Sequence, residues 1–303
     1  MYGLLTPSLR NESKHLALRA NNMIHPDTRL GAVHLTIRDL RRSLDFYQQR
    51  LGFQLRHLEG SKANLGAGGQ DLLVLYENPD ASPYPNRSGL YHFAILVPSR
   101  LELAQSLRHI AETETQVQGF ADHLVSEAIY LPDPDGNGIE IYRDRPRENW
   151  QSLDGELKMA TDPLNIESVL DELHGQEEPW PGLDPSTKMG HMHLHVAAIE
   201  AAENFYHDVL GFDKMMRYGP SASFLSAGGY HHHLGLNTWN GAGAPPPPPD
   251  AVGLRWFVIQ LPNENELNRV IDRVQTAGLA IHEHGTGWLV RDPASNGVLL
   301  TSM

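Results

Sequence analysis

Histidine and acidic side chains gather at a few points of this 303-residue sequence, and together they could hold a metal ion. His191, His193 and His195 alternate along one apolar segment, so in a strand all three would face the same side. Glu140 lies between two isoleucines, where an unpaired carboxylate would be costly to bury. The chain has no cysteine, so any metal must sit on His, Asp and Glu, and there is neither a disulfide framework nor a thiolate nucleophile.

These residues belong to a chain that repeats itself after about 160 residues. Residues 34–53, HLTIRDLRRSLDFYQQRLGF, match residues 193–212, HLHVAAIEAAENFYHDVLGF, and Asp133-Pro134 matches Asp292-Pro293 further along. A period this long indicates a duplicated domain and not a solenoid. Differences between the copies therefore show where metal-binding side chains have been kept or lost.

Each copy contains two similar units of a strand, a helix and three strands. In the first unit a strand over 30–37 ends at Asp39, a good helix N-cap, and apolar residues at helical spacing predict a helix over 40–51 that Gly52 ends. The other ranges that the pattern predicts are strands near 53–57, 72–76, 89–98, 127–131 and 139–142, and a helix over 100–113. We predict an α+β fold of four βαβββ modules, numbered one to four, that begin near residues 30, 89, 190 and 253.

Length and composition bound the organisation of the chain. The sequence predicts an N-terminal arm (1–28), a first domain of modules one and two (29–145), a linker (146–187) with a short helix over 163–174, and a second domain of modules three and four (188–303). A net charge of −13 argues against general nucleic-acid binding, because no basic patch is present to neutralise phosphates. The apolar runs are no longer than a strand, so we predict no membrane span. The N-terminal segment does not resemble a signal peptide, so we predict a cytoplasmic protein.

The helices with FY and LGF, and the closing segment DPDGNGIE, resemble the vicinal oxygen chelate superfamily, which includes glyoxalase I and the extradiol ring-cleaving dioxygenases. The resemblance covers nearly all of residues 30–303. It implies two glyoxalase/bleomycin-resistance/extradiol-dioxygenase-like domains, in which modules pair into a cupped sheet around one metal. Ligands are then expected from the first and last strands of each module.

Carried onto this chain, the resemblance implies the metal ligands His92, Glu140 and His191. Module two offers His92 and Glu140, whereas module three offers His191 and only Gly235 at its last-strand position. The matching positions of modules one and four cannot bind a metal: Ala32, Trp256 and Leu299. Two imidazoles and one carboxylate form the facial triad of non-haem Fe(II) oxygenases, which leaves three positions for substrate and O2. The expected cofactor is Fe(2+), and Mn(2+) would fit the same ligands.

This ligand set makes a geometric prediction about how the modules pair. Pairing one with two and three with four would separate His191 from His92 and Glu140, whereas pairing two with three brings all three together. We therefore predict a metal cup built across the two domains and a metal-free cup from modules one and four. A separation of more than about 10 Å between His191 and Glu140 would contradict this, since ligand bonds are near 2 Å.

Catalytic residues are also implied by the resemblance to extradiol dioxygenases. Residues 224–236, FLSAGGYHHHLGL, resemble a strand that carries a non-ligand catalytic histidine, and the Leu-Gly-Leu end aligns it with His232, with His231 and His233 as alternatives. Such a group must take a catechol proton near neutral pH. Tyr130, ten residues before Glu140, resembles a tyrosine whose hydroxyl bonds the substrate oxygen.

Three further histidines lie in or near the same segments. His123 resembles another substrate-contacting histidine of the family, although its spacing differs. His193 matches His34 of the ligand-free module, which favours a structural role, and His195 stays undecided. Three aromatic residues could wall a pocket: Phe93, Trp239 and Trp256.

The whole arrangement is most similar to the two-domain bacterial catechol-2,3-dioxygenase family. This implies ring cleavage of a catechol or substituted catechol beside its hydroxyls, with both atoms of O2 incorporated, to give a muconic semialdehyde-type product. One alternative is a metal-dependent glyoxalase-like isomerase or lyase, which normally needs a second carboxylate where Gly235 lies. The other is a small-molecule binding protein of the same fold, which would lack the triad. The expected partners are a small aromatic diol and O2, with a homodimer as the expected assembly; the sequence does not choose between a catechol and a hydroquinone.

Overall fold

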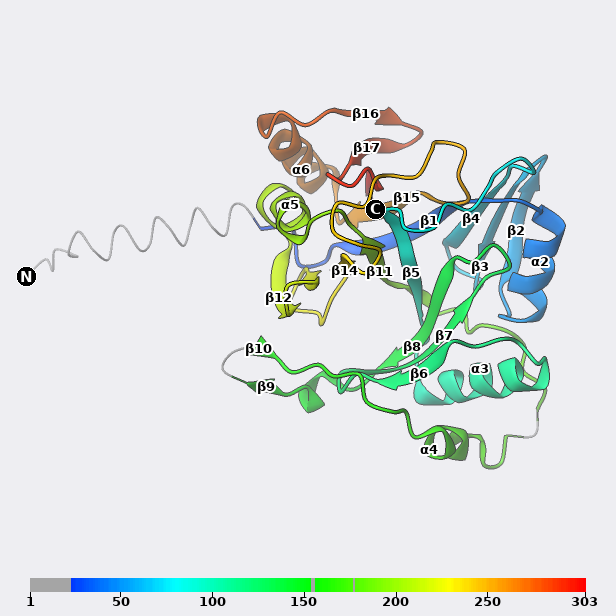
Figure 1. The fold of residues 1–303 in the computed structure, drawn as a ribbon. Helices are drawn as coiled ribbons and strands as arrows, with labels where there is room; N and C mark the ends of the chain where they lie inside the picture. The colour runs from blue at the N-terminus through cyan, green and yellow to red at the C-terminus, as the bar shows by residue number, and fades with distance from the viewer. Residues whose placement is uncertain (1–22, 154–155, 177) are drawn as a thin grey trace, which may run out of the picture.

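Two eight-stranded sheets dominate the computed structural model, which describes residues 23–153, 156–176 and 178–303 (Figure 1). Most of the predicted N-terminal arm, residues 1–28, lies outside the described residues, and the part that is described packs against module three, since the Ile24 N–H donates to the Gly211 carbonyl. None of the helices in the described ranges is long and apolar enough to cross a membrane.

Each predicted βαβββ module is present in the structure. Module one consists of β1 (Arg29–Ile37), α2 (Leu40–Gln49), β2 (Gln54–Glu59), β3 (Lys62–Gly66) and β4 (Asp71–Glu77). Module two consists of β5 (Gly89–Leu96), α3 (Arg100–Glu112), β6 (Gly119–Asp122), β7 (Ser126–Pro132) and β8 (Gly138–Asp144). Module three consists of β11 (Lys188–His195), α5 (Ile199–Glu203) with a π-helical continuation over Asn204–Val209, β12 (Asp213–Tyr218), β13 (Ala222–Ser226) and β14 (Leu234–Asn237). Module four consists of β15 (Gly253–Leu261), α6 (Glu264–Thr276), β16 (Ile281–His284), β17 (Gly287–Arg291) and β18 (Gly297–Ser302).

Local sequence signals set the limits of the first helix. The Asp39 side chain accepts the backbone N–H of Arg42, which caps the start of α2, and Gly52 follows its end with φ of +71°. In the linker the predicted helix over 163–174 is shorter than expected: α4 (Ile166–Leu170) is followed by a single 3-10 turn, and a two-stranded ribbon, β9 (Ser152–Leu153) with β10 (Glu156–Leu157), precedes it.

The sheets pair the modules across the sequence repeat. One sheet has the order β16-β17-β18-β15-β1-β4-β3-β2 and joins modules four and one; the other has the order β12-β13-β14-β11-β5-β8-β7-β6 and joins modules three and two. In the second sheet β5 pairs antiparallel with β11, from Leu96 opposite Lys188 to Gly89 opposite His195. The predicted pairing of module two with module three is therefore confirmed, and each sheet takes one module from each half of the sequence.

A repeated tyrosine–aspartate hydrogen bond connects the two sheets. The Tyr47 hydroxyl of module one donates to Asp133 of module two at 2.9 Å, and the Tyr206 hydroxyl of module three donates to Asp292 of module four at 3.1 Å. All four side chains are buried. The carboxylates of the two matching Asp-Pro segments therefore each anchor the helix of the neighbouring module through its tyrosine.

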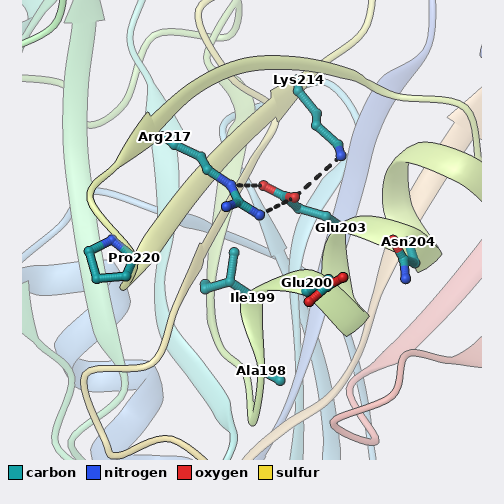
Figure 2. A pocket seen from close by; sticks show the side chains of 8 residues that line it. All are labelled: Ala198, Ile199, Glu200, Glu203, Asn204, Lys214, Arg217 and Pro220. Atoms are coloured by element: carbon teal, nitrogen blue, oxygen red, sulfur yellow. Dashed lines mark hydrogen bonds and ion pairs between the residues drawn. The ribbon is translucent and has the colours of Figure 1, made fainter.

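A polar surface pocket beside α5 and β12 shows a second kind of anchor (Figure 2). The Glu203 carboxylate accepts hydrogen bonds from Arg217 at 2.7 and 2.6 Å and from the Ser223 hydroxyl at 2.6 Å, and Lys214 Nζ lies 3.3 Å away. Burial alone would raise the pKa of Glu203, but these partners lower it from 4.5 to about 2. The pocket has no metal-ligand histidine among its lining residues, so we regard it as a structural anchor for α5.

The lowered pKa of Glu203 predicts a stability that depends on pH. A carboxylate with a folded-state pKa near 2 and an unfolded pKa near 4.5 stabilises the fold above about pH 4.5, and this contribution is lost as the pH falls toward 2. We expect Glu203→Gln to lower Tm at pH 7 by about 2–4 °C, the shift for roughly 1 kcal/mol in a domain of this size. The deficit should shrink on acidification through that window. Glu200→Gln, at an exposed neighbour in the same pocket, is the matched control for scanning calorimetry; a deficit that does not change with pH would contradict the assignment.

Candidate metal centre

Three strands of the two–three sheet bring His92, Glu140 and His191 to one point. The pairing register places Glu140 of β8 and His191 of β11 on either side of Ala94 in β5, with His92 two residues before Ala94. Glu140 Oε2 lies 2.9 Å from His191 Nε2 and 3.1 Å from His92 Nε2, and the two Nε2 atoms are 3.3 Å apart. All three side chains are buried. The three residues predicted from the sequence therefore meet, and the methyl group of Ala94 leaves room for them to converge.

The spacing of these donor atoms fits one divalent ion. Histidine nitrogens and carboxylate oxygens bind metals at about 2.0–2.2 Å, so two ligands at right angles would lie about 3.0 Å apart. The three observed separations, 2.9, 3.1 and 3.3 Å, bracket this value. The donor set, two neutral imidazoles and one carboxylate on one side of an ion, is the kind that Fe(II) oxygenases use. The residues therefore fit a metal of this class.

The charge state of Glu140 also favours the binding of a cation at this site. Burial alone would raise the pKa of Glu140, but the facing His191 and His92 hold it well below its usual value, so the carboxylate stays charged. Burial lowers the pKa of His92, although Glu140 opposes this. The site thus keeps an ionised carboxylate in the interior, where a charge is costly unless a cation balances it.

The position of a fourth ligand is blocked by His193. Gly235 of β14 pairs with His193, and a Cβ atom added at Gly235 would lie 2.8 Å from Cγ and Cδ2 of the His193 ring. The His193 ring is 5.0 Å from that of His92, and its buried Nε2 has no hydrogen-bond partner among the described residues. His193, for which the sequence favoured a structural role, therefore lies inside the cup and occupies the space that a ligand side chain at 235 would need.

The structure separates the three histidines of the 231–233 run. The His232 ring lies 4.2 Å from that of His191, next to the candidate ligands. The His231 ring lies 6.3 Å from that of His191, with its Nε2 2.9 Å from Asp144 Oδ1, and His233 Nδ1 lies 2.9 Å from the Ser226 hydroxyl. Of the three alternatives, His232 is the one whose ring packs directly on a candidate ligand.

Tyr130 and His123 form a pair beside the same cup. Tyr130 stands directly opposite Glu140 in the β7–β8 ladder, and its ring is 5.5 Å from that of His92. His123 Nδ1 lies 2.7 Å from the Ala160 carbonyl, which can only accept, so Nδ1 carries the hydrogen. In a neutral ring His123 Nε2 then accepts the Tyr130 hydroxyl at 2.7 Å. Burial and the neighbouring Glu140 raise the pKa of Tyr130 well above its usual value, so its hydroxyl remains protonated.

The aromatic rim of the cup, which we define as Tyr91 and Trp239, contains one residue that sequence reasoning missed, Tyr91. Strand alternation predicts that Tyr91 faces away from its neighbour His92, yet its ring lies 4.9 Å from that of His92 and 5.1 Å from that of His193. A register shift opposite it, between His193 and Leu194, disturbs the alternation. Trp239, expected to wall a pocket, packs 5.1 Å from Tyr91, and both rings are partly exposed.

The other sheet has a different interior. Trp256 packs with Val258, Leu289 and Leu299 in a separate apolar cluster, and the His34 ring stacks on Trp256 at 4.7 Å. The predicted wall residue Trp256 thus belongs to this sheet, and Phe93 faces the main core. Within the described residues, the only group of three His, Asp or Glu side chains close enough to share an ion is that of His92, Glu140 and His191.

Fold and site together define a member of the vicinal oxygen chelate class with three side chains that could hold a metal ion. The sequence profile of the Glyoxalase/Bleomycin resistance protein/Dioxygenase superfamily matches residues 29–141 and 188–295, and the chain belongs to this superfamily. It is 48% identical over 281 residues to the catechol-2,3-dioxygenase of Bacillus subtilis (strain 168), a match that covers 91% of this chain and 98% of that protein.

Solved structures share the fold at low sequence identity. A protein from Bacillus subtilis subsp. subtilis str. 168 superposes with a TM-score of 0.61 and 10% identity, covering 93% of this chain and 85% of its own. Glyoxalase I from Zea mays superposes with a TM-score of 0.55 and 16% identity, covering 91% and 92% of the two chains. These likenesses support the architecture alone.

The buried carboxylate provides the most direct test of metal binding. We expect Glu140→Gln to weaken binding of Fe(II) by more than about 100-fold, because the loss of even an outer-shell partner costs 10–100-fold. The measurement is bound metal per chain after anaerobic loading and dialysis. Glu203→Gln, which removes another buried carboxylate outside the cup, should retain the wild-type content. Equal metal contents in the wild type and Glu140→Gln would exclude Glu140 as a ligand.

Proposed function

We propose that this protein is a non-haem Fe(II) extradiol dioxygenase that opens the ring of a catechol, or a substituted catechol, beside its two hydroxyl groups. The observation that carries the proposal is the three-donor site with its fourth position closed, in which Gly235 lies under the His193 ring. A site with only three protein donors keeps positions free for both hydroxyls of a diol and for O2. The 48% identity to a catechol-2,3-dioxygenase over nearly the whole chain supports the same reaction.

In this proposal His92, Glu140 and His191 hold the metal. A bound Fe(II) would supply a redox centre where diol and O2 meet, and the donor set would also accept Mn(II). The remaining side chains orient the diol and move its protons. The aromatic rim of Tyr91 and Trp239 would pack against the ring of the substrate.

His232 is the proposed general base. Burial lowers the pKa of His232 well below its usual value, so its ring is neutral at pH 7 and can accept a proton from a substrate hydroxyl. Tyr130 keeps its hydroxyl proton, and it can turn from His123 to donate to a substrate oxygen. His123 is held by the Ala160 carbonyl and keeps Tyr130 at the edge of the cup.

The two alternative functions explain the site less well. A glyoxalase-like isomerase would need a second carboxylate at position 235, where a side chain has no room beside His193. A binding protein without a metal would have to bury the Glu140 charge with only imidazole partners. The proposed enzyme makes a muconic semialdehyde-type product; a cytoplasmic location and a homodimer remain predictions from the sequence.

Anaerobic loading with Fe(II), followed by catechol and air, tests the proposal. We expect about one iron per chain and the yellow colour of a ring-opened semialdehyde. His232→Ala should keep its iron and lose about 100- to 10,000-fold in kcat, the usual contribution of a general acid or base. In the control, His233→Asn, the amide oxygen can replace His233 Nδ1 in its contact with Ser226. Iron without product from catechols or hydroquinones, or full activity in His232→Ala, would refute the assignment.

A further inference from the structure

A chain of hydrogen bonds leads from the proposed base away from the metal cup. His232 Nδ1 lies 2.8 Å from His231 Nδ1, and His231 Nε2 lies 2.9 Å from Asp144 Oδ1. Asp144 ends β8, four residues after Glu140, whereas the histidines lie between β13 and β14. These hydrogen bonds therefore connect module two to module three.

We propose that Asp144 and His231 form a positioning pair that fixes the tautomer of His232, with the hydrogen on Nδ1 and the lone pair on Nε2. The hydrogen bonds of the pair are observed whatever the function is. Its role in catalysis rests on the proposed dioxygenase function.

The tautomers follow from which atoms can donate. A carboxylate only accepts, so His231 Nε2 must carry a hydrogen to bond Asp144. A neutral imidazole has one N–H group, which leaves a lone pair on His231 Nδ1. His232 Nδ1 must then donate to that lone pair, and the lone pair of the His232 ring is left on Nε2. This is the nitrogen that a general base needs to have free.

The ring of His231 is enclosed by aromatic side chains. His231 is fully buried, and its ring lies 6.0, 5.4 and 4.0 Å from the rings of Tyr142, Trp150 and Tyr230. These contacts hold the ring between Asp144 and His232.

The Asp144 end of this series of hydrogen bonds is held by two tyrosines. The Tyr230 hydroxyl donates to Asp144, 3.0 Å from each carboxylate oxygen, and the Tyr142 hydroxyl lies 2.7 Å from that of Tyr230. Because Tyr230 uses its only hydrogen on Asp144, Tyr142 must donate to Tyr230. These contacts keep the carboxylate turned toward His231.

The other ring nitrogen of His232 is not engaged. Nδ1 is bonded to His231, whereas Nε2 has no hydrogen-bond partner among the described residues. The His232 ring lies 4.2 Å from that of His191 and 5.0 Å from that of Phe224. Nε2 is therefore the nitrogen left to accept a proton from a diol hydroxyl in the proposed reaction.

Histidine tautomers can be read directly from long-range 1H–15N correlation spectra of the full chain, labelled with 15N-histidine and loaded with diamagnetic Zn(II). The His232 signals are identified by their absence in His232→Gln. We expect hydrogen on Nδ1 of His232 and on Nε2 of His231. In Asp144→Asn the amide oxygen can accept from Tyr230 while its NH2 group donates to His231, so both rings should reverse their tautomers.

The kinetics of the Fe(II)-loaded enzyme give a second test of the pair. Asp144→Asn should lower kcat by about 10- to 100-fold, the usual effect of losing an outer partner, with KM changed less than about twofold. Asp144→Glu, which keeps an acceptor, should recover part of kcat. Ser226→Ala, at the partner of His233, is the control and should leave the His232 tautomer unchanged.

Two outcomes overturn the positioning pair: hydrogen on His232 Nε2 in the wild type, or an unchanged His232 tautomer in Asp144→Asn. The failure of the proposed function looks different. In that case the wild type would show the expected tautomers and iron content and still open no diol ring.

Discussion

The antiparallel pairing of β5 with β11 is the constraint on which the rest of the structure depends. It fuses module two with module three and sets Glu140, Ala94 and His191 in one row across three strands. Residues from the two halves of the sequence meet only because of this register, and a slip of one residue would turn His191 to the other face. The tyrosine–aspartate bonds between the sheets then connect this cup to the sheet of modules one and four.

The two sheets of the duplicated chain differ in the residues that fill their interiors. In the two–three sheet the charged Glu140 carboxylate faces two imidazoles, and His193 over Gly235 limits the site to three donors. In the one–four sheet the corresponding space contains Trp256 and Leu299, which pack as ordinary apolar core. We infer that the sheet of modules one and four mainly stabilises the fold. The sheet of modules two and three carries the free-energy cost of burying the Glu140 charge, at the place where chemistry is proposed.

Much of this could be predicted from the sequence because module positions repeat. The four βαβββ units follow from the repeated pattern, whereas the convergence of His92, Glu140 and His191 and the pairing of module two with module three follow from residue types at the positions that the superfamily resemblance marks as ligands. Other features could not be predicted. The alternation rule fails for Tyr91 opposite a register shift, and the Asp144–His231 bond joins residues 87 apart that share no motif. The helix over 204–209 becomes π-helical, although its counterpart in module one is a regular helix, and no spacing signal distinguishes them.

We propose that one metal binds where modules two and three meet. A crystal structure of the protein loaded anaerobically with Fe(II), with anomalous data collected on both sides of the iron edge, tests this most directly. We expect one strong anomalous peak per chain, about 2.0–2.2 Å from His92 Nε2, His191 Nε2 and a Glu140 oxygen, with no further protein ligand at Gly235. An iron peak bound elsewhere, for instance between His34 and His284 of the other sheet, or a fourth protein ligand on the ion, would contradict it.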